Sequence, residues 1–219
     1  MSPQRSRVEI QSWEARYYDL LLNVASLGRY PRLVEAAIEK MGIERGQSIL
    51  DLGSGTGKND CLIAGKTGPG GRVVGLDISN EMLRRARTRC RDYPYVTFEK
   101  QRIELPLSYE EHFDKVFICF VLHGFEDDAK LRIAQGAHRA LKPGGVLCIL
   151  DYAEFDLEGL WFPLRFAFTH GECELAAEFL KLDIKTMLSS QGFSGFREEF
   201  FFRGHVRLLD AAKAQRGSP

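Results

Sequence analysis

The sequence predicts an α/β fold, with a mainly parallel sheet and helices on both faces, and three observations lead to this prediction. From residue 48 onward, short β-branched or apolar segments alternate with helical patterns of about ten to fifteen residues, which is typical of β-α-β crossovers. Two segments, FICF at 117–120 and VLCIL at 146–150, are apolar throughout, as expected of strands covered on both faces. A glycine-rich segment, DLGSGTG at 51–57, joins the first expected strand to a helix.

The strands of this sheet are expected where short apolar or β-branched segments lie between turn signals. The last two segments are aromatic or β-branched and suit an antiparallel pair that closes one edge of the sheet. In chain order, the expected strands are Ser48–Leu52, Arg72–Ile78, Tyr95–Lys100, Phe113–Phe120, Val146–Leu150, Phe193–Phe202 and His205–Leu209.

The helices are expected from apolar residues at helical spacing and from start and stop signals. Ser79 caps one helix, and Glu81 in its first turn suits the positive end of the helix dipole. The breaker sequences at 67–71 and 142–145 are each expected to end a helix as a turn. The other expected helices are about Ser12–Leu27, Pro31–Met41, Asn59–Lys66, Asp127–Leu141 and about Glu172–Gln191.

Length and composition indicate one soluble globular domain. The 219 residues contain 44% hydrophobic and 27% charged residues, a balance typical of a folded domain rather than a disordered chain. Thirty Lys and Arg balance thirty Asp and Glu, which disfavours a general polyanion binder. Five arginines between 84 and 91 are expected to form a solvated helix face, because no aromatic residues are interleaved for base stacking. No nucleic-acid partner is therefore expected.

The cysteines and the hydropathy pattern indicate a cytoplasmic protein. The five cysteines are scattered and contain no C-x-x-C pair, so we expect neither a disulfide framework nor a zinc site. The first residues lack the apolar stretch of a secretory signal, and no apolar run approaches the ~18 residues of a membrane span. Neither an integral membrane segment nor a bound metal is expected.

The spacing within DLGSGTG decides which ligand the loop suits. A phosphate-binding P-loop needs four residues between its glycines, whereas only three separate Gly53 from Gly57. A dinucleotide loop needs G-x-G-x-x-G, but the third glycine comes one residue early. Asp77, at the end of the second expected strand, suits the hydroxyls of an unphosphorylated ribose. Asp51 would repel a pyrophosphate but suits a cationic ligand, and S-adenosylmethionine meets both requirements.

Four segments carry a family resemblance. ILDLGSGTG, VVGLDIS, FDKVFICFVLHGF and LKPGGVLCILDY resemble, in order and spacing, the class I S-adenosylmethionine-dependent methyltransferases, most strongly over residues 48–152. Residues 15–41 resemble the helical cap of the quinone C-methyltransferases of menaquinone and ubiquinone biosynthesis, and residues 201–213 resemble their closing strands. The resemblance implies a Rossmann-like sheet of seven strands in the order 3-2-1-4-5-7-6, with strand 7 antiparallel.

The resemblance also implies how a single domain over 1–219 is divided. An N-terminal helical cap would occupy 1–45 and a cofactor-binding core 46–152. An acceptor segment and the closing strands would occupy 153–210. The absence of net charge agrees with a small acceptor that carries no phosphate.

The resemblance further places residues around S-adenosylmethionine, whose product would be S-adenosylhomocysteine. Asp51 would meet the amino group, Asp77 the ribose hydroxyls, and Ile78 the adenine face. Gln101, which stands where the family often has Asp, would accept a hydrogen bond from the adenine amino group. The cofactor-binding residues implied in this way are Tyr18, Asp51, Gly53, Ser54, Gly55, Gly57, Asp77, Ile78, Gln101, Cys119 and Phe120.

His123 and the aromatic segment at 158–168 are the candidates for acceptor chemistry. His123 directly follows the fourth expected strand, at the edge where parallel sheets bind ligands, and is the candidate general base. Its alternative is a residue that caps the loop or packs beside the cofactor. Trp161, Arg165 and His170 are candidates for contact with the acceptor. The alternative for the aromatic residues is packing against the cap or in a dimer interface.

These observations predict methyl transfer from S-adenosylmethionine to a small, mostly apolar or aromatic acceptor. Both C- and O-methylation are open, and a quinone-like acceptor is among the candidates. The alternative function is a non-catalytic module that binds S-adenosylmethionine and serves a partner protein. A monomer or a homodimer is expected.

Overall fold

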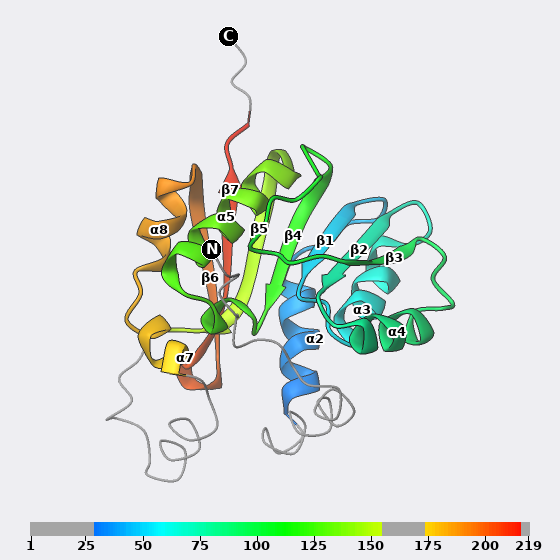
Figure 1. Ribbon diagram of the computed structural model, residues 1–219, viewed down its shortest axis with the longest axis horizontal. Helices are drawn as coiled ribbons and strands as arrows, with labels where there is room; N and C mark the ends of the chain where they lie inside the picture. The colour runs from blue at the N-terminus through cyan, green and yellow to red at the C-terminus, as the bar shows by residue number, and fades with distance from the viewer. Residues whose placement is uncertain (1–28, 155–173, 216–219) are drawn as a thin grey trace, which may run out of the picture.

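The apolar segments of the chain pair into one seven-stranded sheet. The strands are β1 Ser48–Leu52, β2 Arg72–Asp77, β3 Val96–Lys100, β4 Phe113–Cys119, β5 Leu141–Tyr152, β6 Phe193–Phe201 and β7 Val206–Lys213. The computed structural model describes residues 29–154 and 174–215 and places the strands in the order β3-β2-β1-β4-β5-β7-β6 (Figure 1). Strands β1 to β5 are parallel, and β7 is antiparallel to both β5 and β6, which confirms the expected topology.

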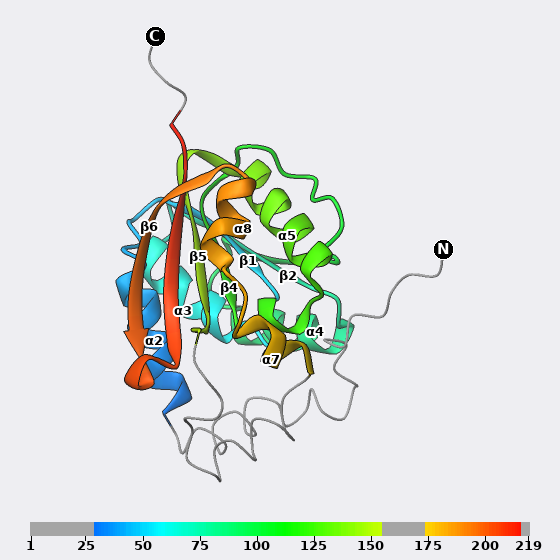
Figure 2. The ribbon, with the colours of Figure 1, turned by 90° about the vertical axis from the view of Figure 1, so that its left-hand side faces the viewer.

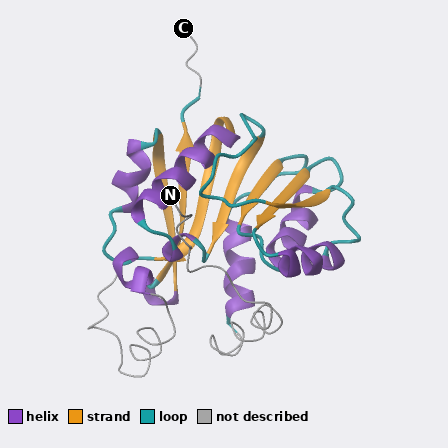
Figure 3. Ribbon diagram, in the orientation of Figure 1, coloured by secondary structure: helices purple, strands orange, loops and turns teal. Residues whose placement is uncertain are grey.

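Two layers of helices cover the sheet (Figure 2 and Figure 3). The helices are α2 Tyr30–Lys40, α3 Lys58–Thr67, α4 Asn80–Arg89, α5 Asp127–Ala140, α7 Glu174–Phe179 and α8 Ile184–Ser190, with short turns η1 Leu122–Gly124 and η3 Phe202–Gly204. Helices α2, α3 and α4 pack on one face, and α5, α7 and α8 pack on the other. The helix expected at about 12–27 lies outside the described residues. Within those residues, no helix combines the length and apolar content needed to cross a bilayer.

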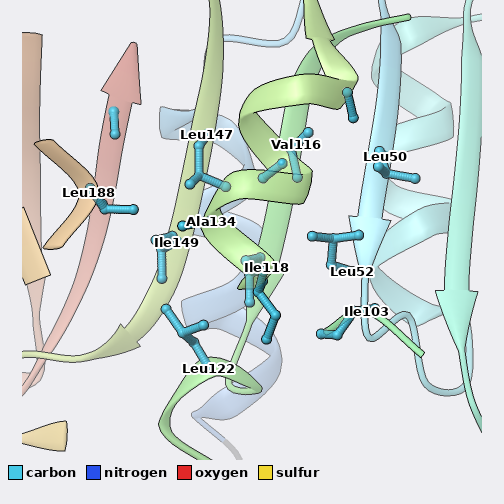
Figure 4. Packing of buried hydrophobic residues seen from close by; sticks show 14 of the residues in the cluster. Leu50, Leu52, Ile103, Val116, Ile118, Leu122, Ala134, Leu147, Ile149 and Leu188 are labelled. Carbon is cyan, nitrogen blue, oxygen red and sulfur yellow. The ribbon is translucent and has the colours of Figure 1, made fainter. Parts of the chain in front are cut away.

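Successive residues of the central strands serve two separate cores, because neighbouring side chains of a strand point to opposite faces. Leu50, Val116 and Leu147 pack toward α5 and α8 (Figure 4). Ile49 and Phe117 pack toward α2 and α3. All five side chains are fully buried. The continuous apolar sequence of these strands therefore reflects burial on both faces.

Strand β5 begins at Leu141, five residues before the expected start at Val146. Between two pairs of its register with β4, Phe113↔Leu141 and Lys115↔Val146, β4 advances two residues and β5 advances five. The segment at 142–145, expected to be a turn that separates helix from strand, is therefore a bulge within β5.

The single helix expected at about 172–191 is two helices, α7 and α8. Asp183 lies between them, and its side chain accepts a hydrogen bond from the backbone N–H of Thr186 at 3.0 Å. This contact caps the first turn of α8, so the chain restarts a helix within a stretch that has helical apolar spacing throughout.

The expectation that the cysteines form no disulfide is wrong for one pair. Cys61 in α3 and Cys90 at the end of α4 are bonded, with their Cα atoms 5.5 Å apart. They are separated by 29 residues in sequence, and only the packing of α3 beside α4 brings them together. Cys119 and Cys148 are buried free thiols, and Cys173 lies outside the described residues.

We expect that Gly75→Ala lowers the free energy of unfolding by about 1–3 kcal/mol. Gly75 lies in the middle of β2, and a Cβ added there would be 2.6 Å from Cδ1 of Phe98 and 2.8 Å from Oδ1 of Asp60. Urea denaturation of the purified variant measures the change.

Gly65→Ala is the matched control. Gly65 is exposed in α3, and a Cβ there meets nothing within 4 Å. This variant should gain about 0.5–1 kcal/mol from helix propensity. Equal unfolding midpoints for the wild type and Gly75→Ala would contradict the close packing of β2 against β3 and α3.

Candidate active site

The glycine loop begins where β1 ends, and its backbone is bonded to the neighbouring strand. The N–H groups of Gly53 and Ser54 both donate to the carbonyl of Leu76, each at 2.9 Å. A Cβ on Gly53, whose φ is +89°, would be 2.6 Å from a methyl carbon of Val121. At Gly55, with φ +52°, a Cβ meets nothing within 4 Å. The loop is thus closely packed beneath Gly53 and open at Gly55.

Gly57 ends the loop at the start of α3 and packs against α4. Its φ is +74°, and a Cβ there would be 2.8 Å from Cα of Ala86 and 3.1 Å from the ring of Phe98. Its carbonyl oxygen lies 3.2 Å from Sγ of Cys90. A side chain at this position would therefore push α4 away from the loop.

The arginines of α4 are divided between the surface and the loop. Arg84 and Arg85 pair with Glu81, as expected of a solvated helix face. Arg89 instead donates through Nη1 to the carbonyl and the hydroxyl oxygens of Thr56, at 3.1 and 2.5 Å. Arg89 is nevertheless exposed, as expected of a solvated face, and its contact with Thr56 joins α4 to the loop.

Asp77 at the end of β2 joins the loop to the first turn of α4. Its Oδ2 accepts from the N–H of Gly55 at 2.9 Å, and its Oδ1 accepts from the N–H of Ser79 at 2.8 Å. Ser79 in turn caps α4 by accepting from the N–H of Met82, as expected. Each carboxylate oxygen has two lone pairs, so Asp77 keeps the capacity to accept from ribose hydroxyls.

Gln101 lies beside Asp77 at the end of β3. Its backbone N–H donates to the carbonyl of Asp77 at 3.1 Å. Its side-chain amide donates to the carbonyl of Arg102 at 3.2 Å, which leaves the amide oxygen as the acceptor for an adenine amino group. Ile78 is half-buried next to Asp77. The contacts of Gln101 and Ile78 with adenine stay predictions.

Asp51 and Ser54 provide polar atoms that have no partner in the described part of the chain. Asp51 is fully buried, and neither of its carboxyl oxygens has a hydrogen-bond partner there. The hydroxyl of Ser54 is likewise buried and unpartnered. Burial raises the pKa of Asp51 to about 7. An ammonium group would satisfy this carboxyl, and the open space at Gly55 lies in the same loop. The residues present therefore fit S-adenosylmethionine, whose contacts here remain predictions.

Cys119 and Phe120 end β4 on the side that faces α2. Burial raises the pKa of the Cys119 thiol, so this thiol stays neutral and is not a nucleophile. Phe120 has an unusual positive φ of 51°, and its N–H donates to the carbonyl of Leu150 at 2.8 Å. Phe120 directly follows the last residue of β4. Strained backbone of this kind is often found at functional sites.

Tyr30 is a site residue that the sequence analysis did not single out. It is the first residue of α2; its hydroxyl lies 4.0 Å from Sγ of Cys119, and its ring lies 5.7 Å from that of Phe120. The signal for it is topological, because a helix that directly precedes β1 and packs on it begins at the carboxyl end of that strand. Tyr18, which was expected over the cofactor, lies outside the described residues.

His123 lies in η1, just after β4, and is held by Asp151 of β5. Nδ1 of His123 is 2.7 Å from Oδ1 of Asp151, and the His123 N–H donates to Oδ2 at 3.3 Å. Asp151 is 1% exposed and also accepts from the N–H of Tyr152 at 2.9 Å. Asp151 was not among the predicted site residues, because its contact with His123 forms only when β4 and β5 lie side by side.

A row of aromatic rings follows the carboxyl ends of β4 and β5. Phe120 lies 5.6 Å from Tyr152, Tyr152 lies 5.0 Å from His123, and His123 lies 6.4 Å from Phe179 of α7. With Tyr30 beyond Phe120, this row extends from α2 on one face of the sheet to α7 on the other.

The acceptor residues expected at this site are not among the described residues. Trp161, Arg165 and His170, expected to contact the acceptor, lie outside them. Within residues 29–154 and 174–215, no three His, Cys, Asp or Glu side chains are grouped to hold a metal ion.

Comparisons with known proteins agree with the fold and the loop. The family described as "Methyltransferase domain" matches residues 43–192. An uncharacterized methyltransferase of Synechocystis sp., sll0829, is 30% identical over 206 residues, which are 92% of this chain and 94% of that protein. The ubiquinone/menaquinone biosynthesis C-methyltransferase UbiE of Proteus mirabilis is 32% identical over 152 residues, which are 67% of this chain and 59% of that protein.

A solved structure gives the same fold. The crystal structure of a SAM-dependent methyltransferase from Aquifex aeolicus has a TM-score of 0.63 to this chain, at 19% sequence identity. The likeness covers 82% of this chain and 88% of that one. At this level of identity it concerns the fold alone.

We expect that Gly53→Ala weakens the affinity for S-adenosylhomocysteine by about tenfold or more, equivalent to about 1.4 kcal/mol. The added Cβ would overlap Val121 and would be strained at a φ of +89°, so the loop must move from its position beneath the ligand. Titration calorimetry measures the dissociation constant.

Gly42→Ala is the control for this prediction. Gly42 also has a positive φ, of +59°, and a Cβ there meets nothing within 4 Å. It follows α2 at the opposite end of β1 from the loop, so affinity should stay at the wild-type value. Equal affinities for both variants would show that the fit of the loop against Val121 is unimportant for binding.

Proposed function

Because the chain belongs to the class I S-adenosylmethionine-dependent methyltransferases, we propose that it methylates a small aromatic acceptor, at carbon or oxygen, beside His123. The observation that carries this proposal is the contact between His123 and the buried Asp151, set within a row of aromatic rings. It favours an enzyme over a module that only binds the cofactor, because such a module has no need of an oriented base.

The cofactor supplies, when bound, a methyl group on a positively charged sulfur, which an electron-rich atom of the acceptor displaces in line. The chain's own contribution is to position that atom about 3 Å from the methyl group and to remove its proton where it carries one. A phenolic hydroxyl or an acidic carbon becomes a stronger nucleophile when that proton leaves.

His123 is placed to take this proton. Asp151 accepts from Nδ1, which fixes the neutral imidazole in the tautomer whose basic nitrogen is Nε2. Once Nε2 holds the proton, the carboxylate of Asp151 stabilises the positive charge on the ring. Because Asp151 is 1% exposed, solvent screens this interaction little.

The aromatic side chains at the carboxyl ends of β4 and β5 support an aromatic acceptor. Phe120 and Tyr152 are partly exposed aromatic rings near His123, and such surfaces pack favourably against another aromatic ring. The relative UbiE is named as a C-methyltransferase of ubiquinone and menaquinone biosynthesis, which supports a quinol-like acceptor here. The balanced charge of the chain likewise suits an uncharged small molecule better than a polyanion.

The acceptor class is tested with S-adenosylmethionine labelled in its methyl group. The purified protein is incubated with phenol, catechol and a short-chain naphthoquinol, and labelled products are separated and identified. We expect labelled product from at least one aromatic hydroxyl compound and none from single-stranded oligonucleotides. Transfer to the oligonucleotides alone would overturn the proposal.

We expect that His123→Ala lowers kcat by about 100-fold or more, because general base catalysis typically contributes at least that factor. Asp151→Asn should lower kcat by a smaller factor, since it keeps the hydrogen-bond acceptor but removes the charge. In both variants KM for S-adenosylmethionine should stay near the wild-type value. Steady-state kinetics at saturating acceptor measures both constants.

His112→Ala is the matched control for this pair. His112 is exposed, and its Nδ1 contacts the carbonyl oxygen of Glu110 at 2.9 Å, away from the carboxyl ends of the strands. Its kcat should equal that of the wild type. Unchanged kcat in His123→Ala would rule out His123 as the base.

A further inference from the structure

A second buried carboxyl, Asp60, lies beside Asp51. It is the third residue of α3 and, like Asp51, is fully buried. Neither carboxyl has a hydrogen-bond donor among residues 29–154 and 174–215. Gly75 explains how they meet, because it is opposite Asp51 in the pairing of β1 with β2, and a Cβ there would be 2.8 Å from Oδ1 of Asp60.

Two carboxylates this deeply buried cannot both be ionised unless a positive charge lies between them. They are close enough for one to donate a hydrogen bond to the other when it holds a proton. Burial and the adjacent negative charge of Asp51 raise the pKa of Asp60 well above its usual value. Because both carboxyls are fully buried, the pair shares at least one proton when no cation is present.

Among residues 29–154 and 174–215, the groups that face this pair add no positive charge. Asp77 of β2 is a further carboxyl, and its charge raises both pKa values. Cys119 of β4 is a neutral thiol, beside which lies the neutral hydroxyl of Tyr30 from α2. The side chain of Asn59 in α3 also contacts Cys119 and is uncharged.

We propose that the carboxyl pair of Asp51 and Asp60 shares a proton while the site contains no ligand, and that the ammonium group of the methionine part of the cofactor displaces this proton. Binding then leaves two carboxylates that share a cation, and each proton that the pair held passes to solvent. No bond between heavy atoms changes. The proposal deepens the function proposed above and rests on the predicted contact of Asp51 with the amino group.

The proposal predicts that the protein releases protons when the ligand binds, and the number released can be measured. Below the pKa values of the pair, affinity for S-adenosylhomocysteine should increase at least tenfold for each pH unit, because at least one proton is released for each ligand bound. At about pH 6 the ligand's own amino group, with a usual pKa of about 8, is already protonated and contributes no proton. The released proton is then assigned to the protein.

We expect between one and two protons released per S-adenosylhomocysteine at about pH 6, because the raised pKa values leave both carboxyls largely protonated there, whereas the ligand's amino group is already protonated. Titration calorimetry in two buffers of different ionisation enthalpy measures the number. Asp60→Asn should bind the ligand and release about one proton fewer than the wild type, because its amide does not titrate whereas Asp51 still does. Asp92→Asn removes an exposed carboxyl and should release the wild-type number.

A second ligand keeps the proposal testable if Asp60→Asn fails to fold. 5′-Methylthioadenosine has the nucleoside and the sulfur but no amino-acid part, so its binding to the wild-type protein should release no proton. Equal proton release by both ligands, or by the wild type and Asp60→Asn, would overturn the proposal while leaving the methyltransferase function intact. Failure of the wild type to bind S-adenosylhomocysteine would instead contradict the proposed function.

The pair also predicts how stability without ligand depends on pH. The raised pKa values mean that the folded protein binds more protons than the unfolded chain from about pH 4 to about pH 7, so stability falls as pH rises through this range. Asp60→Asn loses the part of this dependence that Asp60 contributes and keeps the part of Asp51, whose pKa is raised by its own burial. Thermal unfolding of both proteins at a series of pH values measures the difference, and parallel curves would contradict the shared proton.

Discussion

The close approach of the loop after β1 to its neighbours is the constraint on which the rest of the site depends. Gly53 leaves no room for a side chain beside Val121, and Gly57 leaves none beside Ala86. With the loop this close, its N–H groups reach both Leu76 and Asp77. The same contact packs the first turn of α3 against the sheet. The carboxyl of Asp60, in that turn, is therefore buried and does not face solvent.

The order of the strands then separates two kinds of chemistry. Helix α3 follows β1 onto one face, whereas α5 follows β4 onto the other, so the chain diverges between these adjacent strands. A crevice at such a point is where open parallel sheets bind ligands. Carboxyls and glycine N–H groups lie on the side of β1 and β2, and aromatic rings with His123 lie on the side of β4 and β5.

Local sequence patterns predicted the fold and the glycine loop, but they did not predict contacts between segments that are distant in sequence. The alternation of apolar runs indicated the strands, and the spacing of the glycines together with Asp77 indicated the ligand. Asp60 and Asp151 gave no such signal, because each acquires its partner only when a helix or a strand packs beside another. The break at Asp183 was hidden for a different reason, since the apolar spacing continues across it.

The disulfide between Cys61 and Cys90 encloses a covalent ring of chain that contains all of β2. Within that ring lies an exposed turn at Pro69 and Gly70, the kind of segment that proteases cut most readily. Two pieces produced by such a cut would remain joined through sulfur and through the sheet. Electrophoresis without a reductant would then show a single band of full mass, so whether a preparation is intact has to be judged after reduction.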